Sequence, residues 1–141
     1  MPISQRDIKD VEAELGQLKL VTGDDEINLT STFSDVVSVS GSGSLQAFSM
    51  ELDSDKIEVK VVSDGNDVFT MDCELLDDMA NDSNAINLGL AGFITWHKGK
   101  KLISFDSKSF CFSYESSFKI QARETSGNRK IERFLCWYLE D

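Results

Sequence analysis

The sequence predicts an α+β fold that is mainly antiparallel β: a bent meander sheet or a sandwich of about eight strands, with one N-terminal helix packed on it. Three observations lead to this prediction. From residue 27 to the C-terminus, apolar residues alternate with polar ones in short runs, which is the period of half-buried strands. Turn-forming residues separate these runs at hairpin spacing. The single proline is Pro2, so every later strand keeps its backbone N–H groups for pairing.

The expected helix covers residues 4–16. Ser4 is a suitable N-cap, and Asp7 stands three residues later in the position of a capping-box acid. Apolar residues at helical spacing form one stripe along this segment, at Ile8, Val11 and Leu15. Gly16 ends the pattern with a residue that is common just after a helix. We therefore expect residues 4–16 to lay their apolar stripe on the sheet.

The first group of expected strands lies in the acidic part of the chain, residues 17–85. Alternating apolar residues mark these strands around residues 27–39, 48–52, 57–61 and 69–73. Asp64–Gly65–Asn66 predicts a tight hairpin, because Asp, Gly and Asn tolerate a positive φ. Residues 75–84 carry several aspartates around three large apolar residues, and this segment is expected to be a short helix or an acidic loop.

A second group of strands lies in the mildly basic, aromatic-rich remainder of the chain. Residues 86–96 alternate as one strand, in which Gly89 and Gly92 indicate a bend or bulge. The basic segment 97–101 is expected to turn the chain. Further strands are expected around residues 102–105, 110–114 and 118–122. The last strand, 131–139, is apolar on both faces near its end, which predicts a central place in a sheet.

The chain is expected to be one domain, residues 1–141, whose charge is unevenly distributed along the sequence. Residues 1–85 carry 19 Asp and Glu against 5 Lys and Arg, a net charge of −14. Residues 86–141 carry 6 against 9, a net charge of +3, and the two parts sum to −11. Carboxylates are rarely buried without a partner, so this excess must lie on the surface. It predicts a strongly negative face and, with it, a basic partner or a cation.

Composition also predicts the compartment. The N-terminus leads directly into a polar, charged segment without the apolar run of a signal peptide. No apolar stretch approaches the roughly 18 residues that span a bilayer, so no membrane partner is expected. Cys73, Cys111 and Cys136 are odd in number, far apart and set among apolar neighbours, which favours reduced, packed thiols. We therefore expect a cytoplasmic protein.

No arrangement of residues in the sequence predicts an enzyme, a cofactor or a metal site. The one histidine, His97, lies in a basic turn, and no nucleophile elbow is present. Zinc would need clustered Cys and His ligands, which the sequence lacks. Gly41–Ser42–Gly43–Ser44 has neither the third glycine of a dinucleotide-binding loop nor the lysine of a P-loop. The acidic turns leave a calcium-binding β-module as one alternative, because calcium binds several loop oxygens.

Nucleic-acid binding is the principal alternative, ahead of calcium binding, because basic residues interleave with aromatic ones toward the C-terminus, as in a surface that stacks bases. The basic residues are Lys98, Lys100, Lys101, Lys108, Lys119, Arg123, Arg129, Lys130 and Arg133. The aromatic residues are Phe110, Phe112, Tyr114, Phe118 and Trp137. Strand alternation would equally place those aromatics in the core. A net charge of −11 also repels a phosphate backbone, so nucleic acid is the less favoured partner.

The acidic part of the chain supports the leading hypothesis, a non-enzymatic protein that binds a basic protein partner. The candidate partner-binding residues are acids at expected turns and outward strand positions: Asp24, Asp25, Glu26, Asp53, Asp55, Asp64, Asp67, Asp72, Glu74, Asp77, Asp78 and Asp82. Such a face accelerates encounter with a basic partner and presents carboxylates where a nuclease expects phosphates. In its size, its acidity and its lack of catalytic motifs, the chain resembles bacterial immunity proteins, which neutralise toxin nucleases delivered between neighbouring cells. The resemblance implies an inhibitor that occludes the active site of a basic toxin.

Overall fold

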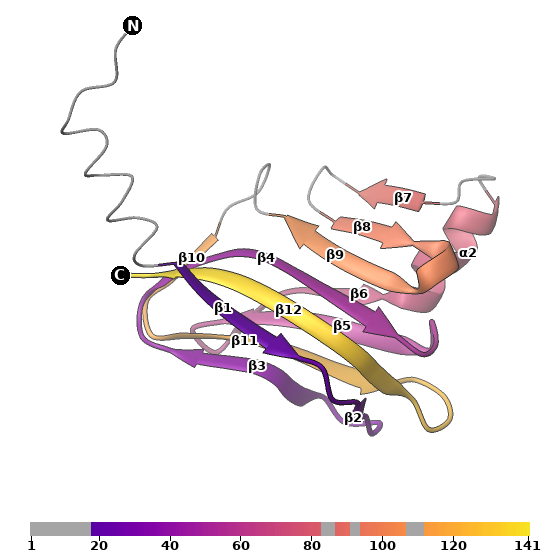
Figure 1. The fold of residues 1–141 in the computed structure, drawn as a ribbon, viewed down its shortest axis with the longest axis horizontal. Helices are drawn as coiled ribbons and strands as arrows, with labels where there is room; N and C mark the ends of the chain where they lie inside the picture. Colours follow the sequence, from indigo (N-terminus) through magenta and orange to yellow (C-terminus); the bar gives the residue numbers. More distant parts are fainter. Residues whose placement is uncertain (1–17, 83–86, 91–93, 107–111) are drawn as a thin grey trace, which may run out of the picture.

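In the computed structural model, the described residues form two antiparallel β-sheets that face each other and one α-helix at one end (Figure 1). The structure describes residues 18–82, 87–90, 94–106 and 112–141, and of residues 81, 82, 87–90 and 112 it describes the backbone only. The architecture confirms an α+β fold that is mainly antiparallel β. Of the two arrangements expected from the sequence, the sandwich is the one found. The helix expected at residues 4–16 lies outside the described residues.

The first sheet contains eight strands. They are β1 (Leu18–Gly23), β2 (Ile27–Asn28), β4 (Gly43–Leu52), β7 (Asn87–Leu90), β8 (Ile94–His97), β9 (Leu102–Asp106), β10 (Phe112–Tyr114) and β12 (Lys130–Glu140). Six follow the order β1-β12-β4-β9-β8-β7, while β2 pairs with β12 and β10 pairs with β4. Trp137 of β12 lies opposite Leu20 of β1 on one side and Ala47 of β4 on the other. The central place expected for the last strand is therefore confirmed.

The second sheet contains four strands. They are, in spatial order, β3 (Ser34–Ser40), β11 (Ser117–Glu124), β5 (Ile57–Ser63) and β6 (Asn66–Asp72). The tight turn between β5 and β6 places Asp64 at φ 53° and Gly65 at φ 80°. This confirms the hairpin expected at Asp64–Gly65–Asn66, whose residue types tolerate a positive φ.

The described ranges contain twelve strands, more than the eight or so expected from the sequence. Residues 86–96 do not form one bent strand: β7 and β8 pair with each other, so the chain reverses between Leu90 and Ile94. Residues 27–39 are divided between β2 and β3, which lie in different sheets. Alternation alone shows neither a reversal nor a change of sheet, because residues on both sides keep the same period of two.

The segment expected to be a short helix or an acidic loop is a helix, α2 (Cys73–Asp82). It begins directly after β6, so the strand expected over residues 69–73 ends at Asp72. The Asp72 carboxylate caps the helix by accepting a hydrogen bond of 3.1 Å from the backbone N–H of Glu74. Across the described ranges, no helix has both the length and the apolar character needed to cross a membrane.

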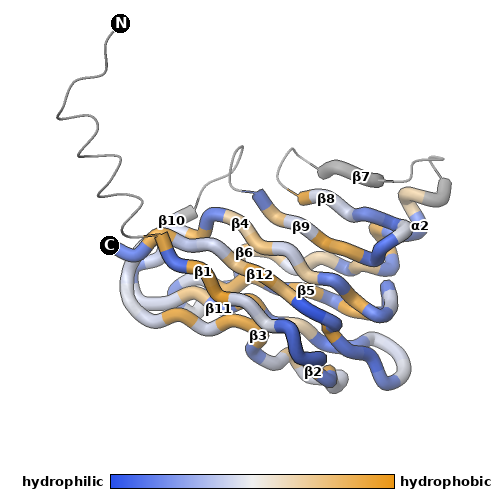
Figure 2. The backbone as a smooth tube through the Cα atoms, in the orientation of Figure 1, coloured by the Kyte–Doolittle hydropathy of each residue, from blue (hydrophilic) through white to orange (hydrophobic). Residues whose placement is uncertain are grey.

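The core lies between the two sheets and is built from alternate residues of the strands, which Figure 2 shows as hydrophobic and hydrophilic positions in turn. The rings of Phe48 and Phe105 stack at 5.4 Å within the first sheet. Phe105 also stacks at 5.9 Å on Phe69 of β6. Phe118 of β11 meets Tyr138 of β12 edge to face at 5.6 Å. Aromatic pairs between the sheets therefore fix how they pack on each other.

Two cysteines are buried in this core as free thiols, Cys73 and Cys136. Burial raises the pKa of the Cys136 thiol to about 12, and it raises the pKa of the Cys73 thiol as well. Thiols that remain protonated in this way are poor nucleophiles. Both therefore act as packing residues, while Cys111 lies outside the described residues.

Candidate partner-binding surface

The fold brings the basic residues of the C-terminal part against the acids of the N-terminal part. In the first sheet β12 lies between β1 and β4, and in the second sheet β11 lies between β3 and β5. Among the described residues, five ion pairs join a base of the C-terminal part to an acid of the N-terminal part: Lys130–Glu26 at 2.9 Å, Arg123–Glu58 at 3.0 Å, Arg133–Glu51 at 3.2 Å, Lys119–Asp35 at 3.4 Å and Lys98–Asp77 at 3.8 Å. The uneven charge of the sequence is therefore partly neutralised within the fold.

Four of the acids predicted to bind a partner are used in ion pairs. Glu26 pairs with Lys130 and Asp77 with Lys98, as above. The hydrogen bond from Lys130 lowers the pKa of Glu26. The other two are Asp67, 3.6 Å from Lys60, and Glu74, which pairs with Lys56. These carboxylates already have a cation beside them, and a partner would have to compete for them.

Seven of the predicted acids have no basic side chain within ion-pair distance among the described residues. They are Asp24, Asp25, Asp53, Asp55, Asp64, Asp72 and Asp78. Asp82 belongs to α2, and its side chain lies outside the described part of the chain. Among the candidate residues whose side chains are described, these seven therefore carry the negative charge that no neighbouring base compensates.

Six of the seven lie at the end of the sandwich that bears α2. Leu52 at the end of β4 lies opposite Ile131, and Ile57 at the start of β5 lies opposite Glu124. The loops that meet there, with the helix, comprise residues 24–28, 53–56, 72–82 and 125–130, and we call this region the α2 end (right-hand side of Figure 1). Its acids without a basic partner are Asp24, Asp25, Asp53, Asp55, Asp72 and Asp78.

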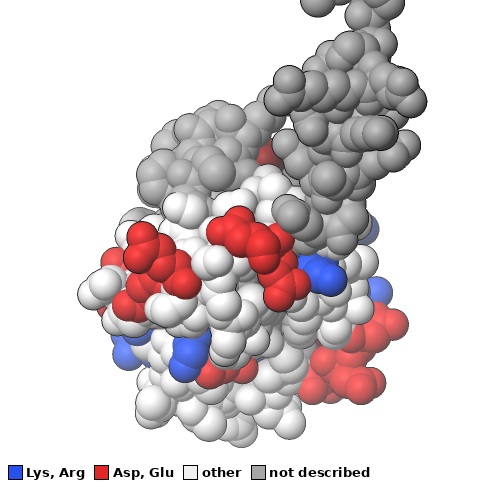
Figure 3. Space-filling view, turned by 90° about the vertical axis from the view of Figure 1, so that its left-hand side faces the viewer, with Lys and Arg blue, Asp and Glu red and all other residues white. Residues whose placement is uncertain are grey.

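The opposite end of the sandwich holds the other two predicted acids at the β5–β6 turn, Asp64 and Asp67. In Figure 3, which faces this end, acidic side chains form several separate groups with basic ones between them. Asp64 accepts hydrogen bonds from the backbone N–H groups of Glu115, Ser116 and Ser117, and these bonds lower the pKa of its carboxyl group well below the usual range. Asp64 thus joins two turns of the fold. The structure does not bring the predicted acids together on one face.

The helix α2 has an unusual division between its buried and exposed sides. Its buried residues are Cys73, Leu76, Asp77 and Ala80, at the i, i+3, i+4 and i+7 spacing of one helical face. The opposite side carries Leu75, which is 56% exposed, Met79, which is 42% exposed, and the exposed Asp78. A carboxylate therefore takes an inner position while two large apolar side chains face solvent. Buried polar groups and exposed apolar patches are the informative exceptions to ordinary burial.

The inner carboxylate, Asp77, is 8% exposed and has a partner at each of its two oxygens. The indole N–H of Trp96 donates to it at 3.1 Å. Lys98, in the single turn of 3-10 helix η1 (Lys98–Lys100), lies 3.8 Å from its other oxygen. These partners offset the cost of burying the charge and attach α2 to β8 and η1.

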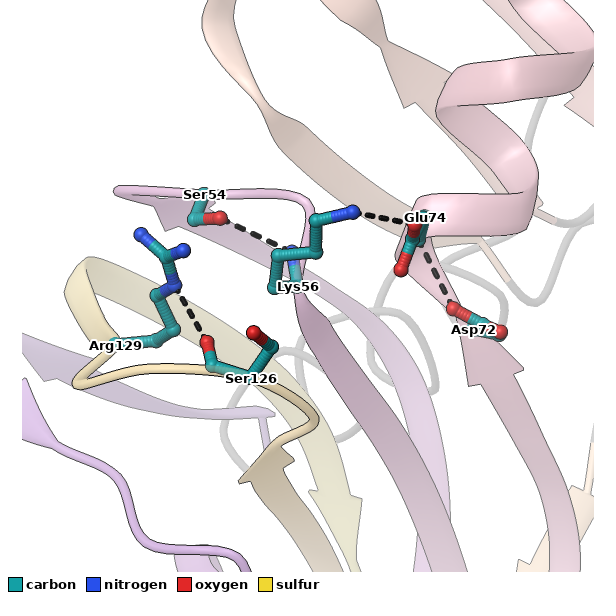
Figure 4. A network of polar contacts seen from close by, with 6 residues as sticks. All are labelled: Ser54, Lys56, Asp72, Glu74, Ser126 and Arg129. Carbon is teal, nitrogen blue, oxygen red and sulfur yellow. Dashed lines mark hydrogen bonds and ion pairs between the residues drawn. The ribbon is translucent and has the colours of Figure 1, made fainter.

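A second polar network holds the start of α2 (Figure 4). Lys56, in the β4–β5 turn, donates a hydrogen bond to Glu74, which raises the pKa of the Lys56 amine. The backbone N–H of Glu74 is bound in turn by Asp72. On the neighbouring loop, the Arg129 guanidinium donates to the carbonyl of Ser126 at 2.8 Å. The first turn of α2 is therefore held by Lys56 and Asp72, both through Glu74.

The outer face of the first sheet carries a second exposed apolar group, Leu20, Leu135 and Trp137, at 50%, 39% and 37% exposure. The group borders a groove of about 600 Å³ lined by Thr22, Gly23, Asp24, Ser49, Glu51, Leu102, Arg133, Phe134 and Leu135. Trp137 is the one aromatic residue of the proposed base-stacking set that is exposed among the described side chains, since Tyr114 and Phe118 are buried. Phe110, and the side chain of Phe112, lie outside the described part.

Sequence reasoning identified the acids of α2 but missed its exposed apolar pair. In the sequence, Leu75, Leu76 and Met79 stand among aspartates, and this grouping alone assigns no side of the segment to the sheet. The helical spacing of residues 73, 76, 77 and 80 could have shown the buried side, because a helix places Cys73 and Ala80 on the same face. Among the described residues, no three Asp, Glu, His or Cys side chains are grouped closely enough to hold a metal ion.

Comparison with known proteins identifies no family. No family model matches the chain, and no curated protein matches it. Among solved structures, it is similar to a chain of the acidic stable capsid structure of Helicobacter pylori bacteriophage KHP30, with a TM-score of 0.49, 14% identity and 86% of each chain covered. A likeness at this level indicates nothing about function.

Proposed function

We propose that this protein is a non-enzymatic binding protein whose α2 end docks on a basic protein partner. We assign it the role of an immunity-type inhibitor that neutralises a basic, nuclease-like toxin in the cytoplasm by occluding its active site. The observation that carries the proposal is that six acids without a basic partner among the described residues lie at the end of the sandwich that also bears the exposed apolar pair Leu75 and Met79. Carboxylates there would take the place of the phosphates that a nuclease binds.

The way the fold uses its charges supports this proposal. Five basic residues of the C-terminal part pair with acids of the N-terminal part, so much of the positive charge is satisfied internally. The net charge of the chain remains −11. A field of that sign steers a basic protein toward the surface and slows an acidic one. The buried, protonated thiols Cys73 and Cys136 agree with the cytoplasmic part of the proposal.

The test uses the basic C-terminal domain encoded in the reading frame next to this gene. The purified domain should bind this protein and lose its nuclease activity at a one-to-one ratio. The association rate should fall as salt rises from about 0.1 M to about 1 M, because the screening length shortens from about 10 Å to about 3 Å. A neighbouring frame without a basic domain, or a salt-independent association rate, would contradict the proposal.

Two variants with the same change in charge locate the surface. Asp78→Lys alters the α2 end, while Glu115→Lys alters an exposed acid at the opposite end. We expect Asp78→Lys to slow association at least tenfold more than Glu115→Lys does, because the added charge lies at the docking surface. Equal effects of the two variants would show that only the overall charge matters.

We further propose that residues 4–16 form the helix expected from their pattern and cover the outer face of the first sheet. Leu20, Leu135 and Trp137 expose apolar surface there, and β1 continues directly from this segment. A helix of this length is about 20 Å long, at about 1.5 Å per residue. Four neighbouring strands span a similar width at about 4.8 Å each. The stripe of Ile8, Val11 and Leu15 would then have an apolar surface to pack against.

A further inference from the structure

We propose that α2 is the recognition element of the partner, and that the partner receives it in an apolar groove rimmed by Lys or Arg side chains. Leu75 and Met79 occupy the floor of this groove, and Asp72 and Asp78 pair with its rim. The inference rests on the proposed function and deepens it, because it names the element that binds and the shape of the surface it fits.

The spacing of the two apolar residues supports insertion into a groove. Leu75 and Met79 are four residues apart, so their side chains lie one above the other on the same side of the helix. At 56% and 42% exposure, both leave a large part of their apolar surface in water. Recognition of a helix by a groove uses anchors at this spacing, and interface energy concentrates in a few such side chains.

The opposite side of α2 is firmly attached, which makes the helix a rigid ligand. Its inner face packs Cys73, Leu76 and Ala80 into the core. The Trp96–Asp77 hydrogen bond fixes the middle of the helix. Lys56, bonded to Glu74, fixes its first turn. A helix that is already ordered loses little conformational entropy on binding, so contacts made by Leu75 and Met79 contribute nearly in full.

The charges around the apolar pair determine which kind of surface fits. The helix sequence CELLDDMAND contains no Lys or Arg, and neither Asp72 nor Asp78 has a basic partner among the described residues. A second copy of this chain would bring these acids against their own equivalents, and an anionic membrane surface would repel them. A protein groove with an apolar floor and a basic rim complements both features of α2.

Apolar and charged contacts act on different rate constants, so the experiment separates them. The full chain and its variants are measured by surface plasmon resonance against the basic domain described above. The double variant Leu75→Ser/Met79→Ser should raise the dissociation rate at least tenfold and leave the salt dependence of association unchanged. Asp78→Asn should slow association and weaken its salt dependence. Leu135→Ser, which removes an exposed apolar side chain elsewhere, is the matched control and should bind as the original protein does.

The outcomes separate the role of α2 from the proposed function of the protein. Unchanged dissociation of Leu75→Ser/Met79→Ser, with melting temperature and salt-dependent binding intact, would overturn the role of α2 and leave the proposed function standing. Failure of the unmodified protein to bind the basic domain would overturn both. A dimer in sedimentation that the double variant dissolves would show that a second copy covers α2, and it too would overturn the inference. Far-UV circular dichroism establishes that each variant is folded.

Discussion

The indole N–H of Trp96 donates a 3.1 Å hydrogen bond to the buried carboxylate of Asp77, and this contact joins β8 to α2. Trp96 itself is 0% exposed, so its indole N–H cannot exchange this partner for water without local opening. The bond also explains why an aspartate occupies the inner side of the helix. With Asp77 inside, Leu75 and Met79 are directed outward, where the proposed partner would meet them.

Removing one partner of this bond should destabilise the protein. In Trp96→Phe the ring packing is largely kept, but the Asp77 carboxylate loses its hydrogen-bond donor. Leaving a buried polar group unsatisfied costs about 1–3 kcal/mol, so the free energy of unfolding in urea should fall by about that amount. Tyr138→Phe, at a partly buried ring elsewhere, serves as the control. A loss no greater than that of the control would show that the bond contributes little.

Acid should destabilise the fold through Asp64. Backbone hydrogen bonds from Ser116, Glu115 and Ser117 lower the pKa of this carboxyl group relative to the unfolded chain. A lowered folded-state pKa means that the stabilisation is present above the unfolded value of about 4 and is lost as pH falls toward the folded value. The melting temperature should therefore drop between about pH 5 and about pH 2, because in that range Asp64 takes up a proton in the unfolded chain but not in the fold.

Asp64→Asn tests the origin of that pH dependence. Asparagine tolerates the positive φ of 53° at this position, so the turn itself is retained. We expect a lower melting temperature at pH 7 and a shallower decline in acid than for the original protein. Asp25→Asn, at an exposed acid without an ion pair among the described residues, should leave both unchanged. An acid decline as steep in Asp64→Asn as in the original protein would assign the effect to other carboxylates.

The fold class followed from features that act locally. Period-two alternation and turn residues depend on the immediate neighbours in the chain, and both the mainly β architecture and the Asp64–Gly65 turn agree with them. The reversal between β7 and β8 was missed because a glycine in an alternating run is equally typical of a bulge and a turn. Which strands share a sheet depends on contacts between distant segments, and those leave no local pattern.

The sequence likewise could not show which acids of the candidate site lack a basic neighbour. The excess of acids before residue 86 was visible in the sequence, but their pairing with β11 and β12 depends on strand order. That order decides which acids retain a negative charge without a neighbouring base. Likewise, the inner position of Asp77 depends on Trp96, which lies nineteen residues further along the chain. The sequence identified the acidic residues, but it did not show that six of them lie at one end of the sandwich.

Gly43 should tolerate no side chain, because the backbone of β12 approaches it closely. A Cβ atom at this position would lie 1.9 Å from the carbonyl oxygen of Leu139 and 2.7 Å from the Tyr114 hydroxyl. Relieving such a clash requires β4 to move away from its neighbours, at a cost of about 1–3 kcal/mol or more. Gly43→Ala should therefore lower the urea midpoint, while Gly99→Ala, which has open space around it, should not. Equal midpoints would mean that the start of β4 adjusts freely to the added side chain.

The proposed helix at residues 4–16 should shield Trp137 from solvent in the full chain. Val11→Asp places a charge in the middle of the apolar stripe, so the segment should leave the sheet and Trp137 should become more accessible to acrylamide. Trp96 is 0% exposed and contributes a constant background to the fluorescence. Glu12→Gln, on the polar side of the same segment, should leave the quenching unchanged, which controls for altered charge. Losing the contact of one Val side chain should also lower the free energy of unfolding by about 1–2 kcal/mol. Identical quenching in Val11→Asp and Glu12→Gln would show that the segment does not cover this face.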